Sequence, residues 1–137
     1  MKSNAISIGV SVRSSLDSAW ECWTKPEHIT QWNFANSEWK CPFAVNELRV
    51  GGEFCWRMES KDGSMGFNYS GTYDQIIPHH FVEKTLDDGR KVQVKFSEEN
   101  DLIVVREIFE PDENDQDLQR KGWQAILENF KKYVESI

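Results

Sequence analysis

One pattern limits the fold of this chain more than any other. From Phe54 onward, segments in which apolar and polar residues alternate are separated by short turn signals at Asp62-Gly63, Asp88-Gly89 and Asn100-Asp101. Alternation with a period of two is typical of strands that bury one face, and turns this short join antiparallel neighbours. The sequence therefore predicts an antiparallel meander rather than a parallel sheet.

The N-terminal segment Ala5–Arg13 alternates in the same way and predicts a first strand ahead of the meander. A Gly51-Gly52 pair predicts a sharp corner after the second strand. The later strands are expected at Leu48–Val50, Phe54–Glu59, Phe67–Ile77, Phe81–Leu86, Val92–Phe96 and Leu102–Phe109.

Two short helices are expected between the first and second strands. Apolar residues from Leu16 to Trp23 recur at helical spacing, and Ser14 is placed to cap that helix. Thr24 and Glu27 have the spacing of a capping box for a second helix, with Pro26 in its first turn. The segment 33–42 fits neither period, so we expect an ordered loop there.

The C-terminal segment predicts one long helix. Apolar residues recur at helical spacing from Trp123 to Ile137, and about twenty residues at ~1.5 Å each span ~30 Å. A sheet with one apolar face needs a cover, and no other segment is long enough to provide it. We therefore expect an α+β fold, with a curved antiparallel sheet of six or seven strands wrapped around this helix.

Composition agrees with a globular chain and narrows the function. The 137 residues suffice for one domain, expected to span 1–137, with a normal core. Sixteen basic residues against twenty-three acidic ones give a net charge of −7, which argues against nucleic acid and anionic lipid as partners. No apolar run is long enough for a membrane span. The oligomeric state, monomer or homodimer, stays open.

The N-terminus and the cysteines indicate a cytoplasmic protein. Residues 1–8 lack the apolar core of a signal peptide. Cys22, Cys41 and Cys55 are odd in number and widely spaced, so we expect reduced thiols rather than disulfides or a zinc site. His79 and His80 are adjacent, and adjacent strand residues face opposite sides, so no metal site is expected.

The chain contains no nucleophile-elbow, Walker-type or dinucleotide-binding motif, so no catalytic residue and no cofactor are predicted. One feature leaves room for chemistry. Arg106 and Glu107 lie side by side in an apolar strand, and one of them should point inward. An inward charge is costly unless paired, so it would be a polar anchor or a catalytic group; the alternative is that this strand end is exposed to solvent.

Several segments, in this order, resemble one known family. They are Trp20–Ile29 with Gln31-Trp32, Leu48–Phe54, Gly71–Tyr73, and Gly122-Trp123 at the start of the apolar part of the last helix. The chain resembles the helix-grip superfamily of START-like and birch-pollen-allergen-like domains (SRPBCC). Within it, the chain is similar to the family named after the activator of the heat-shock-protein-90 ATPase.

The resemblance implies a hydrophobic cavity between sheet and C-terminal helix. It implies a small apolar ligand there: a lipid, a polyketide or a flavonoid-like compound. A minority of the superfamily are cyclases, hydratases or isomerases, so an enzyme acting on an aromatic or polyketide substrate is an alternative. A co-chaperone that regulates a heat-shock-protein-90 ATPase is another, although the eukaryotic co-chaperones carry a further N-terminal domain. A binding protein without catalysis is the function we expect.

Aromatic and apolar residues on the inner faces are the candidates for ligand contact, and Tyr69 and Tyr73 would add polar anchors. The short helices and the segment 33–42 would form the entrance and could move as a lid. The alternative is that all these side chains simply pack as a solid core. The predicted ligand-binding residues are Phe34, Trp39, Phe54, Trp56, Met58, Tyr69, Tyr73, Phe96, Trp123, Leu127 and Phe130.

Gly122 is unusual because it lies inside a helix, where glycine costs roughly 1 kcal/mol relative to alanine. Either a close approach of the helix to the sheet or room for a ligand beside Trp123 would account for it.

Overall fold

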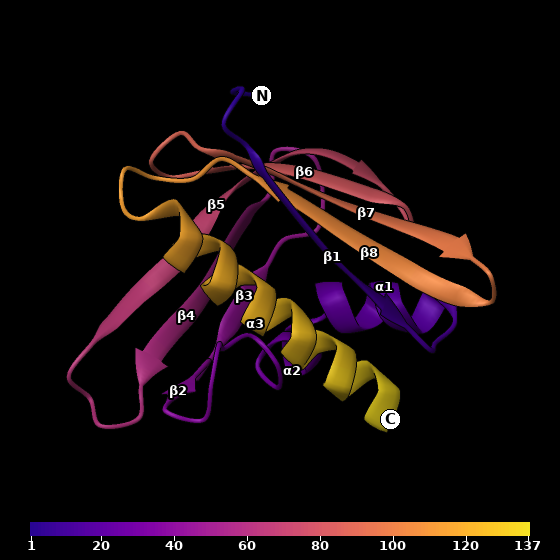
Figure 1. The fold of residues 1–137 in the computed structure, drawn as a ribbon, viewed down its shortest axis with the longest axis horizontal. Helices are drawn as coiled ribbons and strands as arrows, with labels where there is room; N and C mark the ends of the chain where they lie inside the picture. The colour runs from indigo at the N-terminus through magenta and orange to yellow at the C-terminus, as the bar shows by residue number, and fades with distance from the viewer.

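The computed structural model describes all 137 residues and shows the predicted α+β architecture. A curved antiparallel sheet half-wraps the long C-terminal helix α3, and two short helices close one end (Figure 1). The strands are β1 (Ile6–Val12), β2 (Trp39–Lys40), β3 (Ala44–Asn46), β4 (Glu53–Ser60), β5 (Gly66–Ile77), β6 (Phe81–Leu86), β7 (Lys91–Glu99) and β8 (Leu102–Phe109). The helices are α1 (Leu16–Thr24), α2 (Pro26–Ile29) and α3 (Gln116–Ser136).

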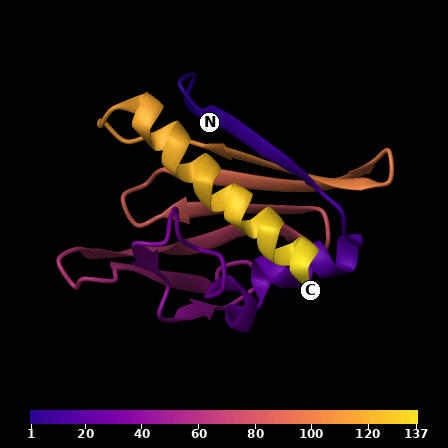
Figure 2. The same cartoon turned by 60° about the horizontal axis from the view of Figure 1, so that its bottom comes forward.

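The strand order is β1-β8-β7-β6-β5-β4-β2, with β3 also paired to β4. Every pairing is antiparallel, as the short turns require. The N-terminal strand therefore pairs with the last strand, and β1 and β2 form opposite edges of the sheet. Figure 2 shows α3 crossing the sheet obliquely, with β1 along one side and β2 to β4 on the other.

Six long strands match the predicted ones, and two short edge strands bring the sheet to eight. The strand expected at Leu48–Val50 is wrong: that segment is a turn, its apolar side chains are exposed, and β3 forms just before it. The Gly51-Gly52 corner is confirmed, because Gly51 has a positive φ of 81° and a Cβ at Gly52 would overlap the Glu47 carbonyl oxygen. The short strand β2 lies within the segment 33–42, which is otherwise loop.

Both predicted caps of the short helices are wrong. Ser15, not Ser14, caps α1, because its side chain accepts a hydrogen bond from the Ser18 amide at 3.1 Å. Thr24 ends α1 instead of capping α2, and its hydroxyl donates to the Trp20 carbonyl at 2.7 Å. Pro26 does open α2, in the first-turn position where its missing N–H costs nothing.

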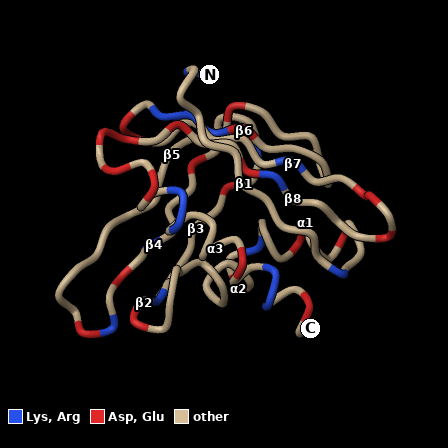
Figure 3. Tube along the Cα trace, in the orientation of Figure 1, with Lys and Arg blue, Asp and Glu red and all other residues tan.

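The buried residues follow the strand and helix periodicities seen in the sequence. In β1 every second residue is buried, and in α1 and α3 the buried residues lie on one face. Trp23 links the layers, because its ring centroid lies 5.0 Å from that of Phe130 on α3 and 5.9 Å from that of Phe96 on β7. Charged residues of both signs are interspersed along the chain (Figure 3). No helix is long and apolar enough to cross a membrane.

Alanine substitutions at two glycines are expected to change stability in opposite directions. A Cβ at Gly71 would overlap the Thr85 carbonyl oxygen of the neighbouring strand, so Gly71→Ala should lower the free energy of unfolding by about 1–3 kcal/mol. A Cβ at Gly122 would meet nothing within 4 Å, so close approach to the sheet does not explain this glycine. Gly122→Ala should therefore raise the free energy of unfolding by about 0.5–1 kcal/mol. Urea unfolding of both variants checks this; a loss of stability in Gly122→Ala would contradict it.

Candidate functional site

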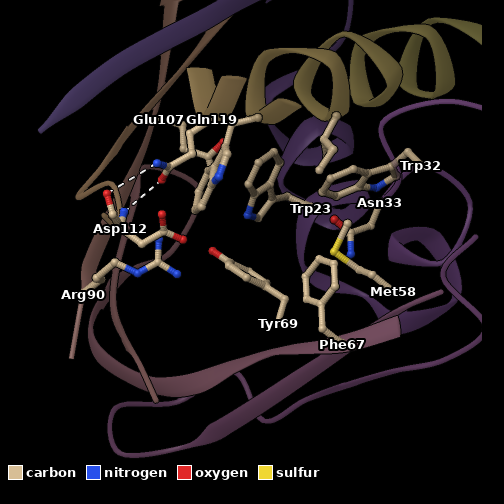
Figure 4. A pocket seen from close by; sticks show the side chains of 12 residues that line it. Trp23, Trp32, Asn33, Met58, Phe67, Tyr69, Arg90, Glu107, Asp112 and Gln119 are labelled. Carbon is tan, nitrogen blue, oxygen red and sulfur yellow. Dashed lines mark hydrogen bonds between the residues drawn. The ribbon is translucent and has the colours of Figure 1, made fainter. Parts of the chain in front are cut away.

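A partly enclosed cavity of about 220 Å³ lies between the concave face of the sheet and α3 (Figure 4). More than half of its lining residues are hydrophobic, whereas two wider and more open depressions, over β5 to β8 and between β1 and α3, are lined mostly by polar residues. The residues that line the cavity are Trp23, Trp32, Asn33, Met58, Phe67, Tyr69, Arg90, Glu107, Asp112, Gln119, Trp123 and Ile126.

Aromatic packing fixes the apolar walls of this cavity. The rings of Trp23 and Trp32 lie 4.8 Å apart, and the Trp32 indole donates a hydrogen bond to the Cys22 carbonyl at 2.9 Å. On the opposite wall, Trp123 stacks on Phe109, with ring centroids 3.9 Å apart and an interplanar angle of 8°. These contacts hold the indoles in place without a ligand, so the walls are preformed.

The entrance expected at the short helices and the segment 33–42 does border the cavity, through Trp32 and Asn33. This segment is tied to α3 at its start. The Asn129 side chain donates to the carbonyls of Trp32 at 3.1 Å and Phe34 at 3.3 Å. Movement as a lid stays a prediction, and it would have to break these two bonds.

The predicted ligand-contact residues divide into three groups. Met58, Tyr69 and Trp123 line the cavity. Phe34 and Trp39 are partly exposed and lie outside the lining. The remainder are buried in the core behind the cavity wall, and any contact with a ligand stays a prediction for them; they are Phe54, Trp56, Tyr73, Phe96, Leu127 and Phe130.

The two tyrosines expected as polar anchors differ. The Tyr73 hydroxyl already donates to Asn46 Oδ1 at 2.5 Å, and that oxygen also accepts from the Trp56 indole at 3.3 Å. The Tyr69 hydroxyl is fully buried and has no hydrogen-bond partner. Burial, with the nearby Glu107 carboxylate, raises the pKa of Tyr69 well above its usual value, so this hydroxyl stays neutral and can donate.

The strand β8 settles which charged residue points inward. Glu107 is 6% exposed and lines the cavity, whereas Arg106 faces solvent. The neighbours of Glu107 across the sheet are Ile8 and Val94. Burial raises the pKa of Glu107 to about 7, even though the charge of Lys84 pulls it down. The solvent-exposed strand end weighed as the alternative is therefore wrong.

Lys84 is the functional candidate that the sequence analysis missed. It is 1% exposed, and its Nζ lies 4.6, 4.3 and 4.7 Å from the ring centroids of Phe54, Trp56 and Tyr69. The amine makes no hydrogen bond, and burial lowers its pKa below the usual range. A signal was present, because Lys84 lies in phase with the buried Val82 and Leu86 in the same strand.

Polar side chains close one end of the cavity. Arg90 is held by Asp88, whose carboxylate accepts from Nε at 2.8 Å, while Nη1 points to the Glu110 carbonyl at 3.4 Å. The Asp112 amide donates to Gln119 Oε1 at 2.9 Å, which fixes the start of α3 against this end. Figure 4 shows the Tyr69 hydroxyl directed toward this end, away from Phe67 and Met58 on the apolar side. The cavity is therefore apolar at one end and polar at the other.

The histidines and cysteines lie apart from this site. His28 Nδ1 is 2.6 Å from the Tyr133 hydroxyl, and His79 Nε2 is 3.1 Å from Asp17. The three cysteines are free thiols, and burial raises the pKa of Cys22 to about 11. No group of three or more His, Cys, Asp or Glu side chains is arranged to hold a metal ion.

Comparison with known proteins adds the family. The model of the family "Activator of Hsp90 ATPase homolog 1-like protein" matches residues 13–135. The AHSA1-like protein from Aeromonas hydrophila is 38% identical, with a TM-score of 0.90 over 96% of this chain and 92% of that one. A protein from Cytophaga hutchinsonii is 42% identical, with a TM-score of 0.84 over 97% and 93%.

A protein from Chromobacterium violaceum shares the fold at 17% identity, with a TM-score of 0.85 over 96% of this chain and 98% of that one. No curated protein matches the chain. The family match covers nearly all of the meander and both helical regions, so the chain belongs to the AHSA1-like family, with the helix-grip fold of the SRPBCC superfamily.

Proposed function

We propose that this protein binds a small hydrophobic molecule in the cavity between the sheet and α3. The observation that carries the proposal is a preformed hollow walled by three indoles, Trp23, Trp32 and Trp123, inside an otherwise close-packed core. Apolar burial of roughly 25 cal/mol per Å² would supply the binding energy. The volume of about 220 Å³ is smaller than the roughly 300–1,000 Å³ usual for ligand pockets, so it favours a compact ring compound over a long-chain lipid.

The polar groups beside the hollow support the same proposal. Native proteins pair nearly all buried polar groups, because a buried group without a partner costs about 1–3 kcal/mol. The Tyr69 hydroxyl and the Lys84 amine have no hydrogen-bond partner here, and both are buried near the end of the cavity that Glu107 lines. A stable fold would gain from apolar residues at these positions. A ligand that uses the polar groups gives a reason to keep them.

Filling the cavity should abolish ligand binding. Ile126 lies on the α3 wall, and Ile126→Trp would place an indole in the hollow. Leu118→Trp is the matched control, because Leu118 is on the same helix but 68% exposed. Titration with tetralin, followed by the indole N–H resonances of Trp23 and Trp32, should give an affinity at least about tenfold weaker in Ile126→Trp and unchanged in Leu118→Trp. Equal tetralin affinity in both variants would show that the cavity is not the binding site.

The buried Glu107 makes stability depend on pH in a defined direction. Its folded-state pKa is raised from 4.5 to about 7, so its favourable contribution is complete below pH 4.5 and is lost as the pH rises to about 7. Glu107→Gln cannot ionise. Relative to the wild type, the variant should therefore gain about 1–3 kcal/mol in free energy of unfolding between pH 4.5 and 7.5.

Urea unfolding at a series of pH values measures this gain. Glu98→Gln is the matched control, because Glu98 is exposed at the end of β7 and should show no such trend. A stability difference between Glu107→Gln and wild type that does not change with pH would mean that this carboxyl is ionised throughout.

One observation favours a second candidate, a cyclase- or hydratase-type enzyme acting on an aromatic or polyketide substrate. Such an enzyme needs an acid–base group inside its cavity, and Glu107 lines the cavity with a pKa near neutrality. A turnover screen with aromatic polyketides tests it: product formation that disappears in Glu107→Gln would establish catalysis, and binding without turnover would exclude this enzyme class.

Regulation of a heat-shock-protein-90 ATPase stays a prediction from the family resemblance, tested by stimulation of that ATPase.

A further inference from the structure

The polar end of the cavity presents hydrogen-bond donors more than acceptors. Tyr69, Lys84 and Glu107 come from three different strands, β5, β6 and β8, and their side chains gather on the inner face of the sheet. The Tyr69 hydroxyl and the Lys84 amine are completely buried and have no partner. Arg90 adds a guanidinium, which carries only donors. A ligand atom that completes this end must therefore be an acceptor.

Lys84 strengthens the donor that Tyr69 offers. Its Nζ does not line the cavity but lies 4.7 Å from the centroid of the Tyr69 ring. A cation over the face of a phenol draws electron density from the ring, which makes the hydroxyl a better donor. The other two rings around Nζ, those of Phe54 and Trp56, hold the amine in this position. In its charged form, Lys84 therefore influences the cavity only through the Tyr69 ring.

Glu107 determines the charge that the ligand can carry. Its carboxyl lies at the cavity wall, so a ligand carboxylate would place two like charges in a buried space, which is strongly unfavourable. A neutral oxygen avoids this cost. It also accepts a hydrogen bond from Glu107 in the protonated form, which burial favours. A neutral carbonyl oxygen can therefore accept hydrogen bonds from both the Tyr69 hydroxyl and the protonated Glu107 carboxyl.

We propose that the cavity selects compact apolar ring compounds that carry a ketone oxygen, which accepts a hydrogen bond from the Tyr69 hydroxyl beside the Glu107 carboxyl. This inference rests on the proposed function and narrows it to one ligand class. The apolar rings would lie against Trp23, Trp32 and Met58 at the other end of the cavity. No covalent step is involved.

A matched set of three probes tests it. Tetralin, β-tetralone and the corresponding β-carboxylic acid share one bicyclic skeleton and differ in the oxygen they present. Titrations at pH 8, followed by the indole N–H resonances, should show β-tetralone binding about three- to tenfold tighter than tetralin. The affinity of the carboxylic acid should be at least about tenfold weaker than that of the ketone, because the acid is ionised beside Glu107.

Tyr69→Phe should remove the preference for the ketone over tetralin, while tetralin still binds because the apolar walls remain. Tyr133→Phe is the matched control, because its hydroxyl contacts His28 away from the cavity and its loss should not change the preference. Tetralin binding also reports that Tyr69→Phe is folded, and a thermal unfolding curve confirms it. Glu107→Gln removes the ionisable carboxyl and leaves the Tyr69 hydroxyl in place, so the ketone preference should persist while the penalty on the carboxylic acid falls.

Any other result would overturn either this inference alone or this inference together with the proposed function. Ketone and hydrocarbon binding with equal affinity, or a preference that survives Tyr69→Phe, overturns this inference and leaves the proposed function standing. Tighter binding of the carboxylic acid than of the ketone would mean that the positive charges of Lys84 and Arg90 outweigh the negative charge of Glu107. That result would also overturn the proposed selection of a neutral ketone. Failure of all three probes to bind overturns the inference together with the proposed site.

Discussion

The aromatic contact between the short helices and α3 determines where the long helix can lie. The Phe130 ring sits 5.0 Å from both Trp23 and Trp32, so the C-terminal half of α3 is fixed against α1 and the loop after α2. Toward its N-terminus the helix meets the sheet through Trp123 stacked on Phe109. The cavity lies under the N-terminal half of α3, where Gln119, Trp123 and Ile126 line it. The rings at both supports fix the helix in place above it.

The polar groups under α3 have a cost that this arrangement must offset. Two buried groups without hydrogen bonds, the Tyr69 hydroxyl and the Lys84 amine, cost about 1–3 kcal/mol each, which is a large share of the 5–15 kcal/mol typical of a small domain. The attraction between Lys84 and Glu107 returns part of this, because each shifts the pKa of the other toward the charged form. Burial still dominates for both groups. Stability and ligand recognition therefore make opposite demands on the same residues.

The fold could be predicted from sequence because it depends on local periods. The alternation in Ile6–Val12 and Phe54–Glu59, and the helical spacing from Trp123 onward, each identify a buried face without knowledge of its partner. The position of a helix cap could be predicted only to within one residue. Ser14 and Ser15 are the same residue type, and only the backbone conformation decides which of them caps α1. The strand expected at Leu48–Val50 failed because alternation over three residues cannot distinguish a strand from a turn.

The cavity could be predicted only in outline. Alternation places Trp56, Met58 and Tyr69 on the inner face, but it cannot tell that Met58 and Tyr69 border a hollow while Trp56 is enclosed. That distinction depends on how far α3 stands from each strand, which is a property of the whole packing. The same phase rule that places one of Arg106 and Glu107 inward also applies to Lys84, which is in phase with Val82 and Leu86. A lysine in phase with valine and leucine is a readable signal, since burying an amine is costly enough to need a reason.

The size and polarity of the hollow together restrict the ligand more than either does alone. A space of about 220 Å³ accommodates a few fused or linked rings and little else. The closed polar end, held by Arg90 and by the Asp112–Gln119 hydrogen bonds, requires that one end of the molecule carry a group able to accept hydrogen bonds. A pure hydrocarbon would leave Tyr69 unpaired, and an anion would meet Glu107. Tyr69 therefore separates ring compounds by the oxygen they present, because the apolar walls bind any skeleton of the right size.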